Sequence, residues 1–375
     1  MKIILAGIIL ASLAFPAVAK ADCNHASRDP ISRISLNGHP FSAIASHDGC
    51  AIFVSLMGDQ RSNLLVLQRN DGSVSKRHII PVDGQLSGMA LSPDGHYLAA
   101  ANGDGVLIFD VARFEDANAD PLIGAYSDGA HAGSIYAAFS PDQRTLFVAN
   151  ERSASLSVYD AGDLPKGLRL IGQVPVGQAP VGLSVTPNGR YLYSTSEVGP
   201  RSWATKCTSE GPPHPEGVLL IIDVAKAATD PAHSVLNGVA AGCNPVRVAI
   251  SGDGKTLYVT ARGDNAIQTF DIEKLLSDAA HSHLASVTVG TSPVGVIAVG
   301  ERVIATNSNR FSGGSSQSFS VLSSTNLLSQ PGSIPAGGFP RELNVTTDGN
   351  TLLVTNFSSG DLELIDLRRL EQAEK

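Results

Sequence analysis

One pattern of sequence recurs seven times along most of this 375-residue chain. Each copy begins with Gly-x-x-Pro or a similar segment, followed by a short apolar run, an Asp-Gly type of turn and a second run that ends near Asn. A third run ending in Asp and a fourth run complete the copy. The start positions are 46 to 48 residues apart, except for one step of 65, and they are Pro40, Ser87, Ser134, Pro180, Pro245, Pro293 and Pro340. Such a repeat indicates a fold of like units that stack side by side.

The unit that repeats is a small sheet. Its apolar residues alternate over short runs between Asp-Gly and Asn-Gly turns, which is typical of β-strands and excludes helical repeats. A composition with 37 glycines and 5% aromatic residues agrees with short strands joined by tight turns. A lone four-stranded sheet cannot cover both of its faces, whereas a closed ring of sheets leaves none uncovered. We therefore predict an all-β fold, a seven-bladed β-propeller of four-stranded blades.

The two ends of the repeat are complementary. The last copy stops after a third strand at 361–367 and is followed only by the charged segment 368–375. The segment that starts at Ile31, ISRISLNGHP, precedes the first full copy and is similar to the fourth strands before Pro293 and Pro340. We predict that this N-terminal strand pairs into the last blade and closes the ring.

Residues 1–21 have the pattern of an export signal, with Lys2, an apolar run over 3–15 and small residues near the cleavage point. Residues 22–375 are then expected to form a single propeller domain, with an insertion at 198–217 in blade four. No later stretch has the roughly 20 apolar residues that a membrane helix needs. We expect a periplasmic or secreted monomer without membrane insertion.

The net charge of −8 argues against nucleic acid as a partner, because nucleic-acid binding requires a basic surface. The sequence contains no Gly-x-Ser-x-Gly elbow, His-Glu-x-x-His, phosphate loop, dinucleotide fingerprint or haem attachment motif. No cofactor and no metal site are therefore expected. An Asp that ends each third strand is expected to cap a turn and not to bind a metal. These residues are Asp110, Asp160, Asp223, Asp271 and Asp366.

A tetrad marks the second strand of four copies, as YVTA at 258–261, LVTN at 353–356, FVAN at 147–150 and IATN at 304–307. At these residues the chain resembles the YVTN-type β-propeller repeat family, which is akin to the lactonase-like seven-bladed propellers. The resemblance extends over essentially the whole chain after residue 21. It implies the propeller fold and no single function, since such families include binding, surface and enzymatic proteins.

Four cysteines in an exported chain indicate two disulfides, for which three pairings exist. In the predicted topology, the loops between blades and those between second and third strands share one face, here named the top face. Cys207 and Cys243 belong to neighbouring loops on the top face, and Cys23 and Cys50 belong to the opposite, bottom face. We predict the pairs Cys23–Cys50 and Cys207–Cys243, with free thiols or a zinc site as the alternatives.

Propellers bind ligands at the mouth of the central channel, so polar residues near the top of the channel are the candidate site. Three groups qualify: the second residue after each start position, residues that follow second strands, and residues of loops between blades. The first group is Ser42, Met89 or Gly88, Tyr136, Gly182, Arg247, Gly295 and Glu342. The second is Glu151, Arg152, Glu197, Arg262 and Ser308, and the third is His39, His131 and Arg341.

These residues allow two interpretations. In the first, arginines hold a carboxylate or carbonyl oxygen while Glu151, Glu197 or Glu342 acts as a base. In the second, Arg247 and Glu342 only brace a water-filled channel. Trp203, in the blade-four insertion, could cover a ligand, anchor a partner or pack within the insertion itself.

Three functions follow in order of preference. The first is a scaffold in the cell envelope that binds a small molecule or a protein through its top face. The alternative, suggested by the resemblance, is a lactonase-like hydrolase or lyase that acts on a small ester or sugar-derived ring. A weaker alternative is the propeller subunit of an exported dehydrogenase.

Overall fold

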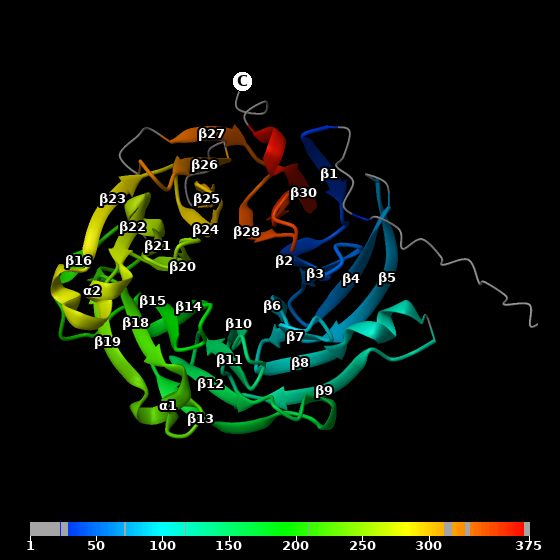
Figure 1. The fold of residues 1–375 in the computed structure, drawn as a ribbon, viewed down its shortest axis with the longest axis horizontal. Helices are drawn as coiled ribbons and strands as arrows, with labels where there is room; N and C mark the ends of the chain where they lie inside the picture. Colours follow the sequence, from blue (N-terminus) through cyan, green and yellow to red (C-terminus); the bar gives the residue numbers. More distant parts are fainter. Residues whose placement is uncertain are drawn as a thin grey trace, which may run out of the picture.

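The computed structural model describes residues 23, 29–70, 73–116, 118–209, 211–310, 317–326 and 331–370, so the expected export signal at 1–21 lies outside the described residues. Seven four-stranded antiparallel sheets surround one axis, and the first strand of each sheet lies innermost (Figure 1). The chain is a seven-bladed β-propeller, as predicted. No helix among the described residues is long and apolar enough to cross a membrane.

The first three blades follow the repeat closely. Blade one contains β2 (His39–Ala45), β3 (Ala51–Met57), β4 (Arg61–Asn70) and β5 (Ser73–Asp83). Blade two contains β6 (Leu86–Leu91), β7 (Tyr97–Asn102), β8 (Gly105–Asp110) and β9 (Leu122–Ser127). Blade three contains β10 (Ser134–Phe139), β11 (Thr145–Asn150), β12 (Ser155–Asp160) and β13 (Arg169–Pro175).

Blade four carries the insertion, which forms a small two-stranded sheet of its own. Blade four contains β14 (Gln178–Val185), β15 (Tyr191–Val198), the inserted β16 (Thr205–Cys207) and β17 (His214–Pro215), then β18 (Val218–Asp223) and β19 (Val235–Ala240). Blade five contains β20 (Pro245–Ile250), β21 (Thr256–Ala261), β22 (Ala266–Asp271) and β23 (His283–Thr288). Blade six contains β24 (Pro293–Val299), β25 (Arg302–Asn307), β26 (Ser318–Ser323) and β27 (Gly332–Pro335), and blade seven contains β28 (Pro340–Val345), β29 (Thr351–Asn356), β30 (Asp361–Asp366) and β1 (Ile31–Ser35).

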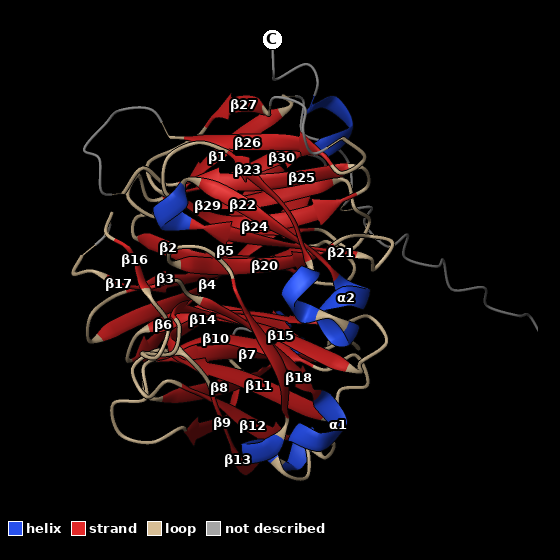
Figure 2. Ribbon diagram, turned by 90° about the vertical axis from the view of Figure 1, so that its left-hand side faces the viewer, coloured by secondary structure: helices blue, strands red, loops and turns tan. Residues whose placement is uncertain are grey.

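Short helices occupy connections between strands. The α-helices α1 (Val224–Ala227) and α2 (Ile272–Ser277) follow third strands and lie on the bottom face, whereas β16 and β17 lie on the opposite side (Figure 2). Each recurring Asp caps the turn after its third strand, as predicted, because its carboxylate accepts a backbone N–H two or three residues later. The 3-10 helices span Val111–Glu115, Leu164–Lys166, Pro231–His233, Arg262–Asp264, Ala279–His281 and Leu367–Arg369.

The turn between first and second strands explains the recurring Asp-Gly motif. In blade two, the Ser92 hydroxyl donates to Asp94 Oδ1 at 2.6 Å and accepts from the Tyr97 N–H at 2.9 Å. Gly95 adopts a left-handed φ of 77°, which glycine tolerates without strain. The turn thus satisfies its own polar groups and sets the register of the two strands that it joins.

The hydrophobic core consists of clusters between neighbouring blades. Seven separate clusters of buried side chains each join one blade to the next, and the cluster between blades seven and one includes Leu353 and Leu362 with Val54 and Leu65. Burial of apolar area stabilises the ring by roughly 25 cal/mol per Å². Because every blade face is covered in this way, the packing itself requires a closed ring.

The ring closes where the sequence predicts it. β1 pairs antiparallel with β30, and Arg33 lies opposite Glu363 in the register. Arg33 Nε forms an ion pair with Glu363, whose side chain is fully buried. Burial raises the pKa of Glu363, and the nearby Arg33 opposes that shift. The closing strand therefore adds a charge contact to its backbone hydrogen bonds.

We expect Arg33→Ala to destabilise the protein by about 1 kcal/mol at neutral pH, because only one partner of this ion pair is buried. Without Arg33 the pKa of Glu363 rises further, so its ionised form is less tolerated in the folded protein. The loss of stability should shrink as the pH falls through that raised pKa. Urea unfolding at several pH values measures this, and a pH-independent loss would contradict it.

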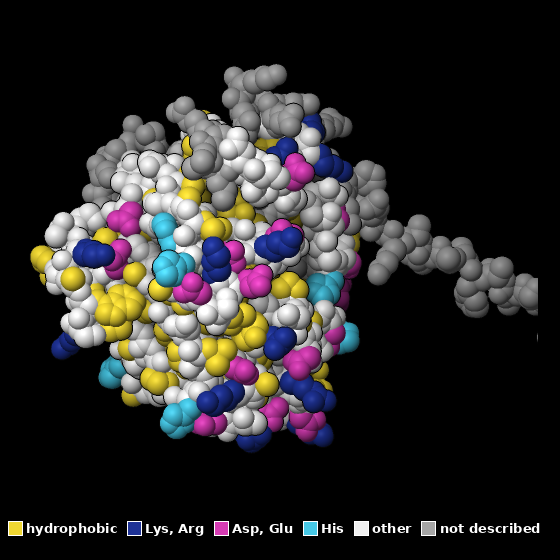
Figure 3. Space-filling view, turned by 60° about the vertical axis from the view of Figure 1, so that its left-hand side comes forward, with side chains coloured by type: hydrophobic (Ala, Val, Ile, Leu, Met, Phe, Trp, Pro, Cys, Tyr) yellow, Lys and Arg dark blue, Asp and Glu magenta, His cyan; other side chains and the backbone are white. Residues whose placement is uncertain are grey.

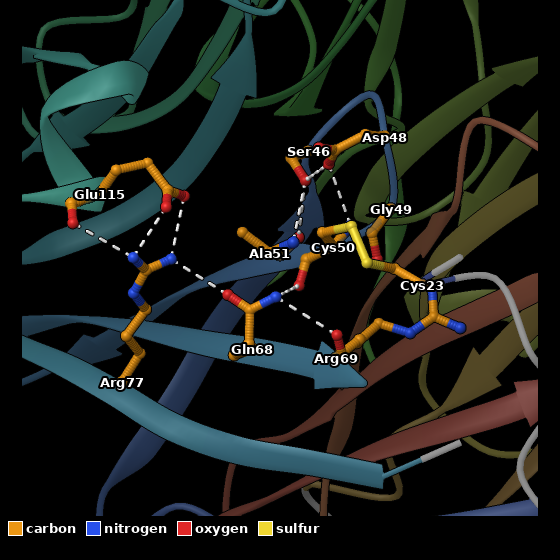
Figure 4. Close-up of a disulfide and its surroundings, with 10 residues drawn as sticks. All are labelled: Cys23, Ser46, Asp48, Gly49, Cys50, Ala51, Gln68, Arg69, Arg77 and Glu115. Atoms are coloured by element: carbon orange, nitrogen blue, oxygen red, sulfur yellow. Dashed lines mark hydrogen bonds and ion pairs between the residues drawn. A yellow bond between two sulfur atoms is a disulfide. The ribbon is translucent and has the colours of Figure 1, made fainter. Parts of the chain in front are cut away.

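Both disulfides form in the predicted pairing, Cys23–Cys50 and Cys207–Cys243. Figure 4 shows the first bridge on the bottom face, beside the turn that joins β2 to β3. There Arg69 Nη1 donates to the Gly49 carbonyl at 3.3 Å, and its Nη2 donates to Thr351 of blade seven at 3.3 Å. The bridge, the ion pair and β1 together fasten the seam of the ring.

Candidate functional site

The innermost strands bring three large polar residues of the candidate set together at the axis: Tyr136, Arg247 and Glu342. The equivalent position in blade two is Gly88 and not Met89, because Leu86, one residue before the start position that the sequence suggests, pairs with Asn102 as Ser134 pairs with Asn150 in blade three. A Cβ atom on Gly88 would overlap the Tyr136 ring. Glycine at this position therefore lets neighbouring blades approach closely.

Arg247 and Glu342 form a bidentate ion pair across the channel. Arg247 Nε and Nη2 donate to Glu342 Oε2 at 3.0 and 2.9 Å, and the two side chains are only 5% and 4% exposed. Burial alone would lower the pKa of Arg247, but Glu342, Tyr136 and Glu197 together outweigh burial and raise that pKa. The Tyr136 ring lies 4.5 Å from the guanidinium carbon, and burial raises the pKa of its hydroxyl. The upward shifts of both pKa values keep Arg247 charged and Tyr136 neutral near neutral pH.

Hydroxyls near the axis link five of the seven blades to the next blade, and they explain the third residue of the tetrad. Thr260 Oγ1 donates to the Val294 carbonyl at 2.7 Å, and Ser55, Thr195, Thr306 and Thr355 make the same bond from their own blades. In blade three this position is Ala149 and has no hydroxyl. The carbonyl that it would reach, on Val181, accepts a hydrogen bond from Arg247 Nη1 instead. Arg247 therefore replaces a missing link between blades.

A second ion pair lies on the top face. Arg262 Nη1 and Nη2 donate to the two carboxylate oxygens of Glu197, both at 2.9 Å. Arg262 is buried and Glu197 is nearly so, with side chains 8% and 17% exposed. Parallel bonds of this kind fix both planar groups. These two candidates are therefore held by each other.

Glu151 lies at the top mouth, and the pKa of its carboxyl is raised. Its side chain is exposed, but partial desolvation and the neighbouring Glu197 carboxylate raise its pKa, while Arg341 and Arg152 oppose that shift.

Two other polar candidates lie apart from these residues. His131 is exposed in a loop with a φ of 61°, and Ser308 donates to the Ser292 carbonyl at 2.8 Å within its own blade.

Arg341 is part of β28 and not of the loop before it, where the sequence places it. Its guanidinium carbon lies 3.8 Å from the ring centroid of Phe41 and 5.5 Å from those of Phe339 and Phe357. We name these three rings the phenylalanine cage. His39 stacks on Phe357 with ring centroids 5.1 Å apart and contacts the Phe357 carbonyl through Nδ1.

Apolar side chains surround the axis at the level of the cage. Val181, Val246 and Val294 form a buried cluster with Phe339, and each valine directly follows the proline at the start position of its sequence repeat. On the bottom side, two adjoining cavities of about 380 and 440 Å³ are lined by residues of the first strands, and both reach Tyr136. Arg247 and Glu342 also line the smaller cavity, so this ion pair faces the lower side of the channel.

Trp203 lies away from the axis. It lines a groove of about 800 Å³ between blades four and five, together with Lys206, Glu216, Phe270 and His283. Figure 3 shows that flank, where hydrophobic side chains lie among charged and histidine side chains. The Trp203 ring also lies close to Gly199 of the insertion. The candidates thus divide into an axial group and a separate groove.

The phenylalanine cage is the feature that sequence reasoning missed. Phe41 follows its start proline as Arg341 does, so the repeat alignment places both residues at the same height on the axis. That alignment could have suggested a contact between blades one and seven. Nothing in the spacing of Phe357, which follows a second strand, shows that its ring turns toward Arg341.

Comparison with known proteins gives a match of fold only. No known protein family and no curated protein sequence matches the chain. A chain of Kuenenia stuttgartiensis hydrazine synthase is similar in structure, with a TM-score of 0.68, 17% identity, and coverage of 89% of this chain and 97% of that chain. A chain from the crystal structure of the mitotic checkpoint complex has a TM-score of 0.67, 16% identity and coverage of 98% and 99%. These likenesses concern the propeller architecture alone.

Proposed function

We propose that this protein is a binding scaffold of the cell envelope and that it holds its ligand at the top mouth of the channel. One observation carries the proposal. Acid–base catalysis would need charged side chains that are not already engaged. Instead, Arg247 is paired with Glu342, and Arg262 is paired with Glu197, each through two or more hydrogen bonds. A group held in this way lacks the proton-transfer freedom of a general base. The Arg262–Glu197 pair also gives the top mouth a fixed charged edge, which favours binding.

A ligand screen by thermal shift tests the binding function. Purified mature protein is expected to gain several degrees in Tm with at least one class of small molecule, because a ligand that binds only the folded state stabilises it. The shift should be lost in the top-mouth double variant Glu151→Gln, Arg152→Gln and retained in Asn344→Ser, which changes the lower cavities. A shift lost only in Asn344→Ser would place the ligand on the bottom face and refute the proposal.

The hydrolase alternative rests on Glu151, because the raised pKa of this carboxyl suits a general base. We expect no turnover of simple lactones and esters above the rate without protein, and therefore no effect of Glu151→Gln on hydrolysis. The measurement is product release from a panel of such substrates. Turnover that falls by about 100-fold or more in the folded Glu151→Gln variant would replace the scaffold with a lactonase-like enzyme.

Two finer proposals accompany the scaffold. The tetrads and the hydroxyl links between blades support kinship with YVTN-type propellers. The two disulfides support residence in an oxidising compartment, the periplasm or the exterior, since disulfides persist there. We propose a single propeller domain over 22–375 that follows an export signal. No observation on this chain favours the dehydrogenase-subunit alternative.

A further inference from the structure

The guanidinium of Arg341 is engaged through its face and not through its edge. Its central carbon lies 3.8 Å from the Phe41 ring centroid, a stacking distance, and the other two rings of the phenylalanine cage lie 5.5 Å away. Stacking uses the flat face of the group, while its five N–H bonds lie in the plane and require acceptors. The cage therefore fixes the orientation of Arg341 and leaves its hydrogen bonds unmade.

No acceptor among the described residues supplies those bonds. The Nε atom of Arg341 is buried and has no hydrogen-bond partner, and no carboxylate or carbonyl of the described chain pairs with its side chain. Arg262, by contrast, holds the Glu197 carboxylate in two parallel bonds, and Arg247 donates from Nε and Nη2 to Glu342 Oε2. Burial, with repulsion from Arg247, lowers the pKa of Arg341 to about 9. The protein thus keeps a partly buried cation whose charge is not balanced.

The surroundings select the kind of anion that could balance it. Arg310 also lies over the cage, 5.2 Å from the Phe339 ring centroid, and the carboxylates that act on Arg341 are Glu342, which already pairs with Arg247, and Glu151. The walls are otherwise apolar, with the valine cluster beside Phe339. Such walls disfavour a doubly charged, strongly hydrated phosphate. A single negative charge on a flat group next to an apolar body fits better.

We propose that Arg341 anchors a carboxylate of the ligand, whose apolar part packs against the half-buried ring of Phe357. This inference rests on the proposed binding function and names the ligand class. The in-plane N–H groups of a guanidinium match the two oxygens of a carboxylate. A free organic acid and the C-terminal carboxylate of a peptide both present this group.

Titration calorimetry with chosen probes tests the anchor. Sodium benzoate is expected to bind, whereas benzamide, which has the same shape without the charge, and inorganic phosphate should bind at least 10-fold more weakly. Arg341→Gln should weaken benzoate binding by at least 10-fold, and Arg341→Lys should have an intermediate effect because lysine lacks the planar fork. The remote variant Arg169→Gln, at an exposed ion pair with Asp160, should bind benzoate as the original chain does.

A stability measurement distinguishes a ligand-binding role of Arg341 from a purely structural role. Without ligand, Arg341→Gln is expected to keep its Tm or raise it by about 2–4 °C, because it removes an unbalanced buried cation. Acetylated Gly-Phe with a free carboxylate, compared with its amide, then separates a peptide terminus from a small acid. Equal benzoate affinity in Arg341→Gln, or equal affinity for benzamide, overturns the anchor.

The two proposals fail in different ways. If the thermal-shift screen finds a top-mouth ligand that binds Arg341→Gln unchanged, the scaffold stands and the carboxylate anchor is wrong. If neither the screen nor benzoate gives any binding in the original chain, the scaffold itself is wrong. Benzoate binding that depends on Arg341 supports both proposals.

Discussion

Arg247→Ala is expected to lower the free energy of unfolding by about 3–5 kcal/mol, the largest effect of any single substitution at the axis. The substitution leaves Glu342 charged, buried and without its partner. It also removes the only side-chain link to the Val181 carbonyl within the described residues, where Ala149 provides no hydroxyl. Urea denaturation followed by tryptophan fluorescence or circular dichroism measures the change.

Two further variants separate the causes of that loss. Arg247→Met combined with Glu342→Met removes both charges and keeps the volume, so most of the stability should return. Ala149→Thr in the Arg247→Ala background should restore a part, because it recreates the hydroxyl link found in blades four to seven. An Arg247→Ala protein as stable as the original chain would show that the ion pair braces nothing and would reopen a catalytic role for it.

Removal of the seam disulfide, by Cys23→Ser with Cys50→Ser, is expected to cost about 3–4 kcal/mol. The bridge spans 27 residues that include the closing strand β1, so its loss frees that strand in the unfolded chain. Because β1 is the outer strand of blade seven, we also expect the seam to open before the rest of the ring. Hydrogen exchange should show faster exchange in β1 and β30 than in β21 and β22.

The second bridge provides the matched control. Cys207→Ser with Cys243→Ser removes a bridge of similar span, 36 residues, that holds only the insertion against the top face. It should lower the global stability by a similar amount under the chain-entropy account, yet leave exchange in β1 unchanged. If both double variants affected β1 equally, the seam would not depend on the Cys23 bridge.

The axis of this propeller uses its arginines in two distinct ways. Arg247 donates hydrogen bonds from all three of its side-chain nitrogens within the protein, and it joins blades three, four, five and seven. Arg341 is oriented by aromatic rings and has no acceptor within the described residues. A cation that the fold orients but does not neutralise is typical of a binding site. Such a cation lowers the stability of the free protein, and only a bound ligand restores that stability.

Much of this structure could be predicted from the sequence because each repeat forms one blade from residues that are close together in the chain. Alternation and turn residues define the strands, and the carboxylates of residues such as Asp271 cap turns within their own segments. The pairing of Cys23 with Cys50 and the position of β1 followed from the order of strands alone. Each of these features depends on neighbours in sequence or on which face a loop occupies.

The candidate site depended on the tertiary structure. The alignment shows that Arg247 and Glu342 face the channel, but they are 95 residues apart and in blades that are not neighbours. The width of the closed ring and the side-chain rotamers that fill it decide which partner each side chain contacts. Neither property can be predicted from the spacing of residues in the sequence. For the same reason the repeat alignment could not distinguish Arg341 from Glu342 as candidates, and only the packed ring shows that Glu342 has a charged partner while Arg341 has no hydrogen-bond acceptor among the described residues.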